Sequence, residues 1–275
     1  MKNKISLFLI SLLVLGLTSC GQKAAKIETL ADLQGKVIGN ISTGISDSGF
    51  VAMLSVLIGG EPAEVVTYNR GIDVLAALKS GKIDGYPSHQ FVADYLLKRD
   101  TQVVSIPVLD VPIEGHAVMA VRTEDFKLKA MLDSAIIILR DKGTISALEQ
   151  EWITNLPAEN EPTFNEIPVI EGAPSYYVGV TGDLPPLDYV ASDGFPAGFN
   201  VALLSEIGKI LNVNFKFVSL ETQARFTALA SKKIDVIFCH FQSANTEYFK
   251  ELENEGWIAT QPYFIYKGGC FIVNK

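Results

Sequence analysis

The chain has 275 residues, a formal net charge of −8 and 48% hydrophobic residues. This hydrophobic content is ample for packed cores, and the length fits one large or two modest domains, of which we favour two. An acidic surface repels a phosphate backbone, which argues against nucleic acid as a partner. His89, His116 and His240 lie far apart and never at metal-ligand spacing, so we expect no metal and no other cofactor.

The first segment has the pattern of an export signal. Two lysines precede an apolar run from Ile5 to Leu17, which is shorter than the roughly 20 residues that span a bilayer but typical of a signal peptide. The following Leu-Thr-Ser-Cys-Gly has the pattern of a bacterial lipobox. We therefore expect residues 1–19 to be removed as a lipoprotein signal peptide, Cys20 to be lipidated and residues 20–27 to form a tether. An ordinary secretory signal with a chance cysteine is the alternative.

Strand and helix patterns alternate along the rest of the chain. The first series has strands at 36–40, 64–68, 83–86, 103–108 and 116–122, and helices at 46–57, 71–80, 90–98, 127–140 and 145–154. Residues 156–174 carry four prolines and four glutamates without periodicity, which is a linker composition. The second series has strands at 176–180, 214–218, 234–238 and 269–273, and helices at 200–211 and 223–231. This alternation predicts mostly parallel sheets covered by helices.

One short sequence occurs twice. Residues 77–84 and 228–235 share Ala-Leu-x-Ser-x-Lys-Ile-Asp, which predicts two similar lobes. In an exported chain, two similar lobes suggest a clamp for a ligand. We interpret the repeated Asp84 and Asp235 as structural residues at the start of a strand.

Beyond the anchor, the chain has Cys239 and Cys270. Two buried free thiols are the favoured interpretation. A disulfide remains open, because both residues lie in apolar strand-like runs and the compartment is oxidising.

Several motifs carry a resemblance to a known family. Gly179 to Tyr189 (GVTGDLPPLDY), with Gly-Phe-Asn-Val at 198–201, resembles the opening of solute-binding proteins of the amino-acid (family 3) type, the extracytoplasmic receptors of ABC importers. Residues 33–39 with Ser-Thr-Gly at 42–44 resemble the start of that family's second lobe. Residues 141–144 with Glu-Trp at 151–152 resemble its carboxyl-terminal helices.

The resemblance covers nearly the whole mature chain in swapped order, so the chain resembles a circular permutant. The implied fold is α/β and two-lobed, of the periplasmic-binding-protein type II kind, with a mostly parallel sheet flanked by helices in each lobe. The expected domains are a second-lobe-like domain at 28–116, a hinge strand at 117–122 and a first-lobe-like domain at 123–275 that includes the linker. One covalent hinge strand predicts a looser hinge, unless the termini pair as strands beside it. A fragment of a tandem array is the alternative to permutation.

The resemblance and the physics of such sheets indicate where a ligand binds, because ligands gather at the carboxyl ends of strands near helix amino termini. From the first half we expect contacts by Ser42, Thr43, Gly44, Ser88 and His89. From the second half we expect contacts by Asp183, Thr222, His240, Gln242 and Ser243. An ordinary helix cap at residues 42–44 and a surface histidine beside the ligand are the plainer alternatives.

Two charged residues typical of the family are replaced in this sequence. His89 stands where an aspartate usually pairs with the ligand ammonium, and a neutral imidazole is a poorer partner. Asn-Thr-Glu-Tyr at 245–248 stands where an arginine usually clamps the carboxylate. Arg225 is either a substitute clamp or, as we favour, part of the scaffold.

The resemblance implies a lipid-anchored protein of the cell envelope, facing the periplasm or the exterior. It is expected to close two lobes over a small polar, amino-acid-like solute and to present that solute to an ABC permease, without catalysing a reaction. The alternatives are a ligand sensor without transport and a cyclohexadienyl-dehydratase-like enzyme.

Overall fold

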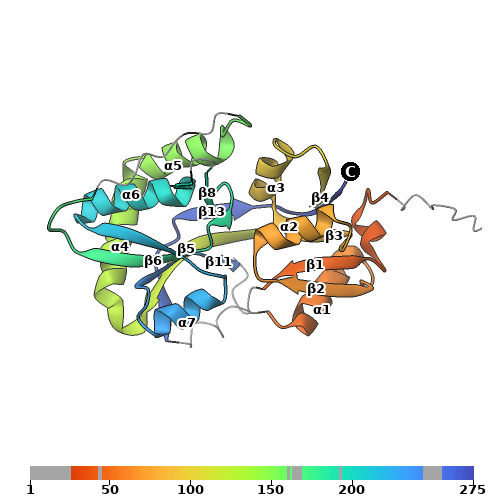
Figure 1. Ribbon diagram of the computed structural model, residues 1–275, viewed down its shortest axis with the longest axis horizontal. Coiled ribbons are helices and arrows are strands. Elements are labelled where there is room, and N and C mark those ends of the chain that lie inside the picture. The colour runs from red at the N-terminus through yellow and green to blue at the C-terminus, as the bar shows by residue number, and fades with distance from the viewer. Residues whose placement is uncertain (1–25, 43–44, 160–161, 163–168, 192–193, 244–255) are drawn as a thin grey trace, which may run out of the picture.

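The computed structural model describes residues 26–42, 45–159, 162, 169–191, 194–243 and 256–275. It has two lobes, each built on its own sheet with helices packed around it (Figure 1). Lobe A contains most of the first part of the chain, and lobe B most of the remainder. The α/β, two-lobed fold expected from the sequence is confirmed.

Lobe A is built on a five-stranded sheet in the order β2-β1-β3-β14-β4. Its strands are β1 Val37–Ile41, β2 Glu64–Tyr68, β3 Gly85–His89, β4 Val103–Val108 and β14 Gly269–Asn274, and its helical elements are the 3₁₀ turn η1 Leu30–Leu33, α1 Asp47–Ile58, α2 Gly71–Lys79 and α3 Gln90–Leu97. β1 pairs in parallel with β2 and β3. β14 runs antiparallel between β3 and β4.

Lobe B is built on a sheet in the order β10-β6-β11-β5-β12, with β13 also paired to β5. Its strands are β5 Glu114–Arg122, β6 Ser175–Val180, β7 Asp183–Leu184, β8 Asp188–Val190, β9 Pro196–Ala197, β10 Asn214–Ser219, β11 Val236–Ser243, β12 Trp257–Ala259 and β13 Phe264–Lys267. Its helical elements are the 3₁₀ turn η2 Thr123–Asp125, α4 Phe126–Asp141, α5 Thr144–Glu149, the π-helical turn η3 Gln150–Thr154, α6 Phe199–Leu211 and α7 Ala224–Ala230. β7, β8 and β9 form a separate small antiparallel sheet.

The repeated Lys-Ile-Asp sequence has the same structural role in both lobes. The Asp84 N–H donates to the Val37 carbonyl at 2.7 Å, and Asp84 Oδ2 accepts from the Val37 N–H at 2.8 Å. Asp235 makes the same two bonds with Tyr177, at 2.8 and 2.9 Å. Each aspartate therefore fixes the start of one parallel strand against the next, as the structural interpretation of these residues requires.

The chain passes between the two lobes twice. β5 follows lobe A in the chain but is paired with β11, β12 and β13 inside lobe B. β14 follows lobe B but ends within the sheet of lobe A, where the chain terminus is seen among the orange strands in Figure 1. Two segments therefore cross between the lobes, residues 109–113 and Gly268, and the Gly268 N–H donates to the Ile113 carbonyl at 2.8 Å.

This arrangement differs from the domain boundaries expected from the sequence. Residues 117–122 are not a hinge but lie within β5, in the sheet of lobe B. Residues 269–274 belong to lobe A rather than to a domain at 123–275. The physical reason is that β14 is an apolar strand buried on both faces, with Phe271 at 0% exposure on one face and Ile272 at 1% on the other. Such a run predicts a buried strand but does not specify which sheet receives it.

The predicted helices and strands lie within one or two residues of the observed ones over most of the chain. The exceptions are β3 and β11, which continue three and five residues beyond the predicted ends at 86 and 238, and several short strands. β7, β8 and β9 have two or three residues each, and β12 and β13 have three and four, which is too short for a clear periodic signal. Cys239 and Cys270 are buried and free, as favoured.

The predicted signal peptide, Cys20 and most of the tether lie outside the described residues, as does part of the 156–174 linker. Within the part of the chain that is described, no helix has both the length and the apolar character needed to cross a membrane. The described side chains also form no His, Cys, Asp or Glu cluster that could hold a metal ion.

Candidate functional site between the lobes

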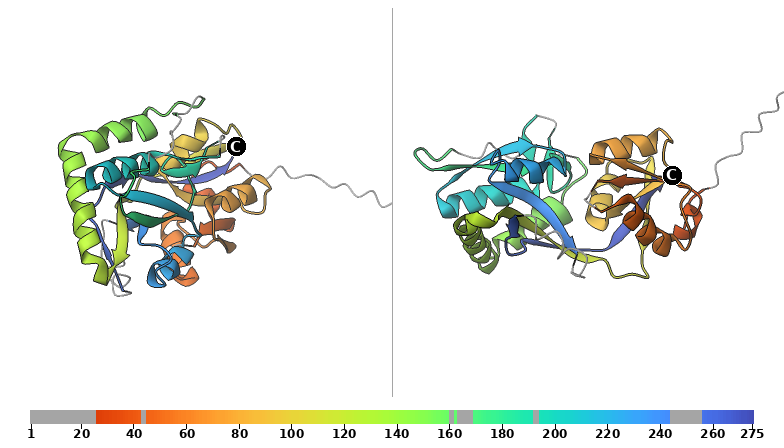
Figure 2. Two further views of the ribbon diagram at one scale, coloured as in Figure 1. Left: turned by 60° about the vertical axis from the view of Figure 1, so that its left-hand side comes forward. Right: turned by 90° about the horizontal axis from the view of Figure 1, so that it is seen from below.

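The candidate site lies where the strand ends of the two lobes face each other. The loop after β2 in lobe A contacts the loop after β6 in lobe B, where α2 packs against β7. Figure 2 shows the two lobes side by side, joined by the crossing segments along one side. The facing edges are the carboxyl ends of parallel strands, the place where doubly wound sheets bind ligands.

An ion pair connects the two lobes at this edge. The Nε of Arg70, the residue that precedes α2, lies 3.5 Å from Oδ2 of Asp183. The side chain of Asp183 is 10% exposed and that of Arg70 is 44% exposed. Asp183 Oδ2 is buried and accepts no hydrogen bond from a described residue. The carboxylate therefore retains an acceptor position that is shielded from water.

Close backbone packing places Asp183 over the amino terminus of α2. A Cβ atom at Gly71, the first residue of α2, would lie 3.2 Å from the Asp183 carbonyl oxygen and 3.8 Å from its Oδ2. Glycine permits this approach. The carboxylate thus lies near the first turn of α2, where unpaired N–H groups favour negative charge.

The loop that carries Asp183 is held by a buried carboxylate behind it. Asp188, which is 2% exposed, accepts hydrogen bonds from the Gly182 N–H at 2.8 Å, the Thr181 hydroxyl at 3.1 Å and the Asn200 amide at 2.9 Å. Burial raises the pKa of Asp188, and these bonds partly offset that shift. Asp188 is a structural support for this loop that the sequence reasoning did not identify.

His89 lies at the end of β3, but its ring is enclosed by aromatic side chains. Phe91 stacks on it at a centroid distance of 5.4 Å, and Phe241 and Tyr266 lie 4.6 and 4.4 Å away. Burial lowers the pKa of His89 to about 4, so the imidazole is neutral at pH 7. Phe91 and Phe241 come from different lobes, so this cluster joins the lobes beside the crossing segments.

Arg225 makes scaffold contacts. Its side chain is buried, and its Nη1 donates to the Phe238 carbonyl at 2.7 Å, while its Nε donates to the Thr222 carbonyl at 3.3 Å. It supports an irregularity in β11, where the register against β5 shifts and Cys239 has a φ of 58°. The favoured interpretation of Arg225 as scaffold agrees with these contacts.

The other predicted ligand residues on β11 do not share one environment. The ring of His240 lies near Phe226 of α7, at a centroid distance of 5.6 Å, and Trp257 of β12, at 5.1 Å. Burial, with the charge of Arg225, lowers the pKa of His240 to about 4. Gln242 and Ser243 pair through their backbones with His116 and Gly115 of β5. The structure therefore does not bring His240 and His89 together, and His89 contacts Phe241, the residue after His240.

In lobe A, Ser42 follows β1, and its N–H donates to the Tyr68 carbonyl at 2.8 Å. Ser88 is half-buried in β3 and its carbonyl faces the Cys270 thiol at 3.7 Å. Thr43 and Gly44 lie outside the described residues. The side chain of Ser46 caps α1 by accepting from the Gly49 N–H at 3.2 Å, so the predicted Ser-Thr-Gly segment does lead into a helix.

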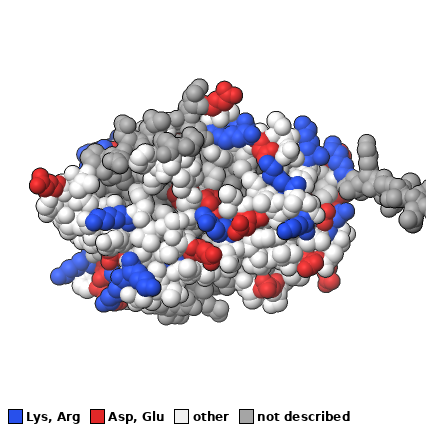
Figure 3. Space-filling view, in the orientation of Figure 1, with Lys and Arg blue, Asp and Glu red and all other residues white. Residues whose placement is uncertain are grey.

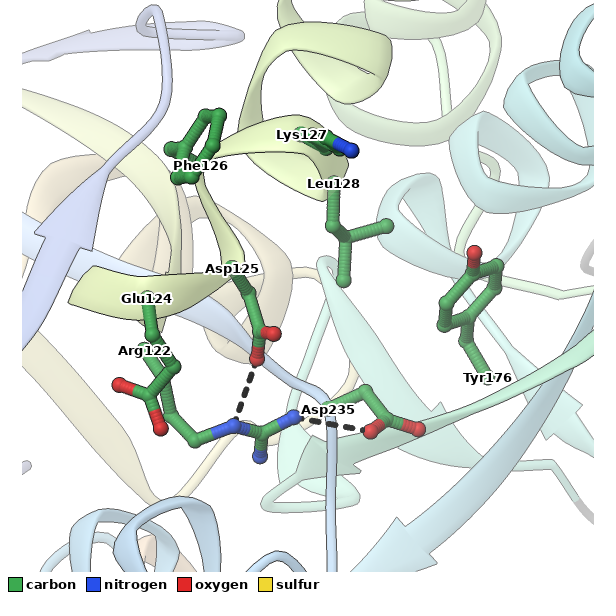
Figure 4. Close-up of a pocket in the computed structure, with 8 residues that line it drawn as sticks. All are labelled: Arg122, Glu124, Asp125, Phe126, Lys127, Leu128, Tyr176 and Asp235. Atoms are coloured by element: carbon green, nitrogen blue, oxygen red, sulfur yellow. Dashed lines mark hydrogen bonds and ion pairs between the residues drawn. The ribbon is translucent and has the colours of Figure 1, made fainter.

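Two pockets lie away from the facing loops. One, of about 430 Å³, is at the opposite end of lobe B, where Arg122 lies between Asp125 and Asp235 (Figure 4). Arg122 also donates to the Leu229 carbonyl at 3.1 Å and the Ile234 carbonyl at 2.6 Å, so it has a structural role. The second pocket, of about 460 Å³, lies between the lobes and is lined by Phe91, Asp94, Leu97, Lys98, Ile153 and Thr154.

Basic and acidic side chains are mixed on the face seen in Figure 3. Described cations there lie beside described acids and do not form a separate basic area. This distribution agrees with the acidic composition of the chain.

Comparisons with known proteins give two family matches. Residues 176–271 match the model of bacterial extracellular solute-binding proteins, family 3. Residues 17–143 match a model described as NMT1/THI5 like. No curated protein sequence matches the chain.

The structure is also similar to solved structures. The ligand-binding component of an ABC-type import system from Staphylococcus aureus, with zinc bound, has 15% identity and a TM-score of 0.46, over 87% of this chain and 66% of that one. The arginine-bound form of domain 1 from TmArgBP has 38% identity and a TM-score of 0.23, over 23% of this chain and 50% of that one. A putative L-cystine ABC transporter from Listeria monocytogenes has 10% identity and a TM-score of 0.43, over 88% and 83%. The chain spans less than two thirds of the first two proteins.

The structure is a two-lobed α/β fold in which the strand ends of the lobes face each other. The two family matches, each over less than half of the chain, support a type II solute-binding protein of the family 3 kind. The family 3 match over residues 176–271 agrees with the resemblance seen in the sequence.

Sequence reasoning missed Arg70. The signal that could have found it is its position between a strand and a helix, at the carboxyl edge of a parallel sheet.

Proposed function

We propose that the protein is a lipid-anchored extracytoplasmic solute-binding protein that closes its lobes over a small polar, amino-acid-like solute and delivers it to an ABC permease. The observation that carries this proposal is the buried carboxylate of Asp183, which lies opposite a cation of the other lobe with a free acceptor position. A small solute bearing an ammonium group would satisfy that acceptor. The family 3 match supports the same class of function.

The predicted ligand residues remain part of this proposal. Ser42, Ser88 and Asp183 lie at or beside the carboxyl ends of their strands, and Thr43 and Gly44 follow the end of β1 in sequence. Thr222, Gln242 and Ser243 come from the corresponding edge of lobe B. His89 and His240 would act by shaping the site through their aromatic neighbours, because both imidazoles are neutral at pH 7.

The proposed permuted order is supported by the positions of the family motifs. The motifs that resemble the family's opening begin near Tyr176, whereas those that resemble its carboxyl-terminal helices end near Trp152. The linker at 156–174 would join these two former ends. Permutation is tolerated where the joined ends lie on the surface.

A ligand screen tests the function. We would measure thermal unfolding of the soluble chain from Gly21 with amino acids, amines, small carboxylates and prephenate, since a ligand that binds only the native state raises the melting temperature. Stabilisation by one amino acid at concentrations far above its Kd would support the proposal. Stabilisation by prephenate alone would favour the dehydratase-like alternative, and no stabilisation by any compound would contradict an amino-acid-like solute.

The proposed anchor is tested separately. Cells that produce the full chain would be labelled with a fatty-acid analogue, and membrane and soluble fractions compared. We expect label and membrane association in the native protein and neither in Cys20→Ser. Equal label in both proteins would contradict lipidation of Cys20.

A further inference from the structure

We propose that Arg70 and the amino terminus of α2 form an anion-binding subsite on lobe A, which Asp183 occupies in the structure described here and which the carboxylate of the solute occupies in the complex. This inference rests on the proposed function and assigns one of its binding residues. It also explains how an anionic group is held although the sequence lacks the arginine expected after β11.

The first support is the unsatisfied state of Asp183. A buried carboxylate oxygen without a donor is costly, and such groups are uncommon in native structures. Oδ2 of Asp183 is in this state, although the side chain is only 10% exposed. Among the described residues, Arg70 is the cation within 4.0 Å, and its Nε lies 3.5 Å away without forming a hydrogen bond. The contact is an ion pair that a better-placed group could replace.

The second support is the place where this carboxylate lies. A Cβ atom at Gly71 would lie 3.8 Å from Oδ2 of Asp183. The carboxylate therefore lies against the first turn of α2, a helix of nine residues. The helix dipole and the guanidinium act there in the same direction. Asp73 in that turn is exposed, so its opposing charge is screened by solvent. Asp183 thus marks an anion position made by lobe A alone.

The third support is the chemistry of the arginine. The guanidinium presents donors in a planar fork that matches a carboxylate, and 44% of the Arg70 side chain is exposed. A solute carboxylate can approach it from the interlobe side.

The exchange of partners determines which solutes bind well. A solute that carries both a carboxylate and an ammonium gives Arg70 and Asp183 a new partner each. A solute with only one of these groups separates the ion pair and leaves one of its members without a counter-ion. Arg70 therefore selects for zwitterions, and the Arg70–Asp183 pair holds the lobes together when no solute is bound.

The experiment has two measurements on the soluble chain from Gly21, made on wild type, Arg70→Gln, Arg70→Lys and Lys79→Gln. Lys79 is a matched control, because it lies on the same helix, has a 41% exposed side chain and pairs at 2.8 Å with Asp100 inside lobe A. The first measurement is the affinity for each of the common L-amino acids, for the amine that lacks its carboxylate and for the acid that lacks its ammonium. The second is the radius of gyration without ligand, by small-angle X-ray scattering at low and high salt.

We expect Arg70→Gln to bind the preferred amino acid about 10- to 100-fold more weakly, as is typical when a charged hydrogen-bond partner is lost. The corresponding amine should not lose affinity in this variant and should bind it at least as tightly as wild type, because Arg70→Gln has no ion pair with Asp183 to separate. Arg70→Lys should recover part of the affinity, since it keeps the charge and loses the fork. Lys79→Gln should bind as wild type does.

Without ligand, Arg70→Gln should have a larger radius of gyration than wild type at low salt, and the two should converge at high salt. Combining Arg70→Asp with Asp183→Arg should restore the wild-type radius. Unchanged affinity and unchanged radius in Arg70→Gln would overturn the inference. If no amino acid or amine binds to wild type, the proposed function fails, while the radii still decide whether the ion pair holds the lobes together.

Discussion

His89 and His240 occupy equivalent positions in the two copies of the repeat, and each ring is packed against aromatic side chains. His89 lies among Phe91, Phe241 and Tyr266, and His240 lies between Phe226 and Trp257. The repeated strands β3 and β11 thus carry the same residue type in similar surroundings, although β11 continues to Ser243 and the two rings face different parts of the molecule.

This relationship predicts a loss of stability in mild acid. Burial lowers the pKa of both histidines from about 6.5 to about 4. The unfolded chain therefore binds these protons first, so stability is fully present above pH 6.5 and is lost as the pH falls toward about 4. Tyr266 stays neutral, because burial raises its pKa to about 12. We expect a loss on the order of 2 kcal/mol per histidine over this range.

Urea unfolding of the soluble chain at pH 7.5 and 4.5 would measure this effect. The variant with His89→Phe and His240→Phe keeps ring packing and removes both titrations, so its unfolding free energy should fall less between the two pH values. An identical fall in wild type and variant would show that other groups, such as the carboxylates, carry the pH dependence.

The sequence predicts the strands and helices of both lobes because their apolar periodicity is local information. It also predicts the roles of Asp84 and Asp235, because a repeated residue at a repeated position indicates a repeated contact. It does not predict that β14 enters lobe A, since a strand buried on both faces carries no mark of its partner. Arg70 was missed for a related reason: its partner, Asp183, is more than a hundred residues away in sequence.

The duplicated aspartates should contribute unequally to stability. Asp84 bonds to the backbone of Val37, whereas Asp235 bonds to the backbone of Tyr177 and also pairs with the buried Arg122 at 3.1 Å. We expect Asp84→Ala to cost about 1 kcal/mol and Asp235→Ala about 2 to 3 kcal/mol, because only the latter leaves a buried cation with fewer partners. Chemical denaturation of both variants at pH 7.5 tests the order. Equal losses would mean that the Arg122–Asp235 pair adds nothing to stability.

Both described cysteines should be unreactive in the native protein. Burial raises the pKa of Cys239 and of Cys270 to about 12, so neither carries much thiolate near pH 8. We expect slow reaction with an aromatic disulfide reagent in buffer and rapid reaction of both thiols in urea. The chain from Gly21 contains no other cysteine, so the count is unambiguous. No reaction in urea without reductant would show a disulfide instead.

Arg225 should be required for stability, although the equivalent position in lobe A is apolar. Aligning the two repeats places Arg225 opposite Val74, which is 0% exposed in the core of lobe A. Arg225 supplies a donor to the Phe238 carbonyl at the irregular part of β11, and its charge lies near the buried Asp188. In Arg225→Met the carbonyl loses its donor and Asp188 loses a nearby cation. We expect a cost of about 2 to 3 kcal/mol, measured by urea unfolding at pH 7.5.

The control for this variant is Val74→Met, which enlarges the equivalent side chain in lobe A and removes no polar contact. Overpacking of a core position typically costs about 1 to 3 kcal/mol, so the free energies of the two variants can be similar. The pH dependence of the unfolding free energy distinguishes the two variants. Burial raises the pKa of Asp188, and loss of the Arg225 charge raises it further. The folded protein then keeps this proton at pH values where the unfolded chain has lost it. The unfolding free energy of Arg225→Met should therefore fall more steeply than that of wild type as the pH rises above the ordinary carboxyl pKa. Val74→Met should keep the wild-type pH profile, and a wild-type profile in Arg225→Met would show that Arg225 does not act on Asp188.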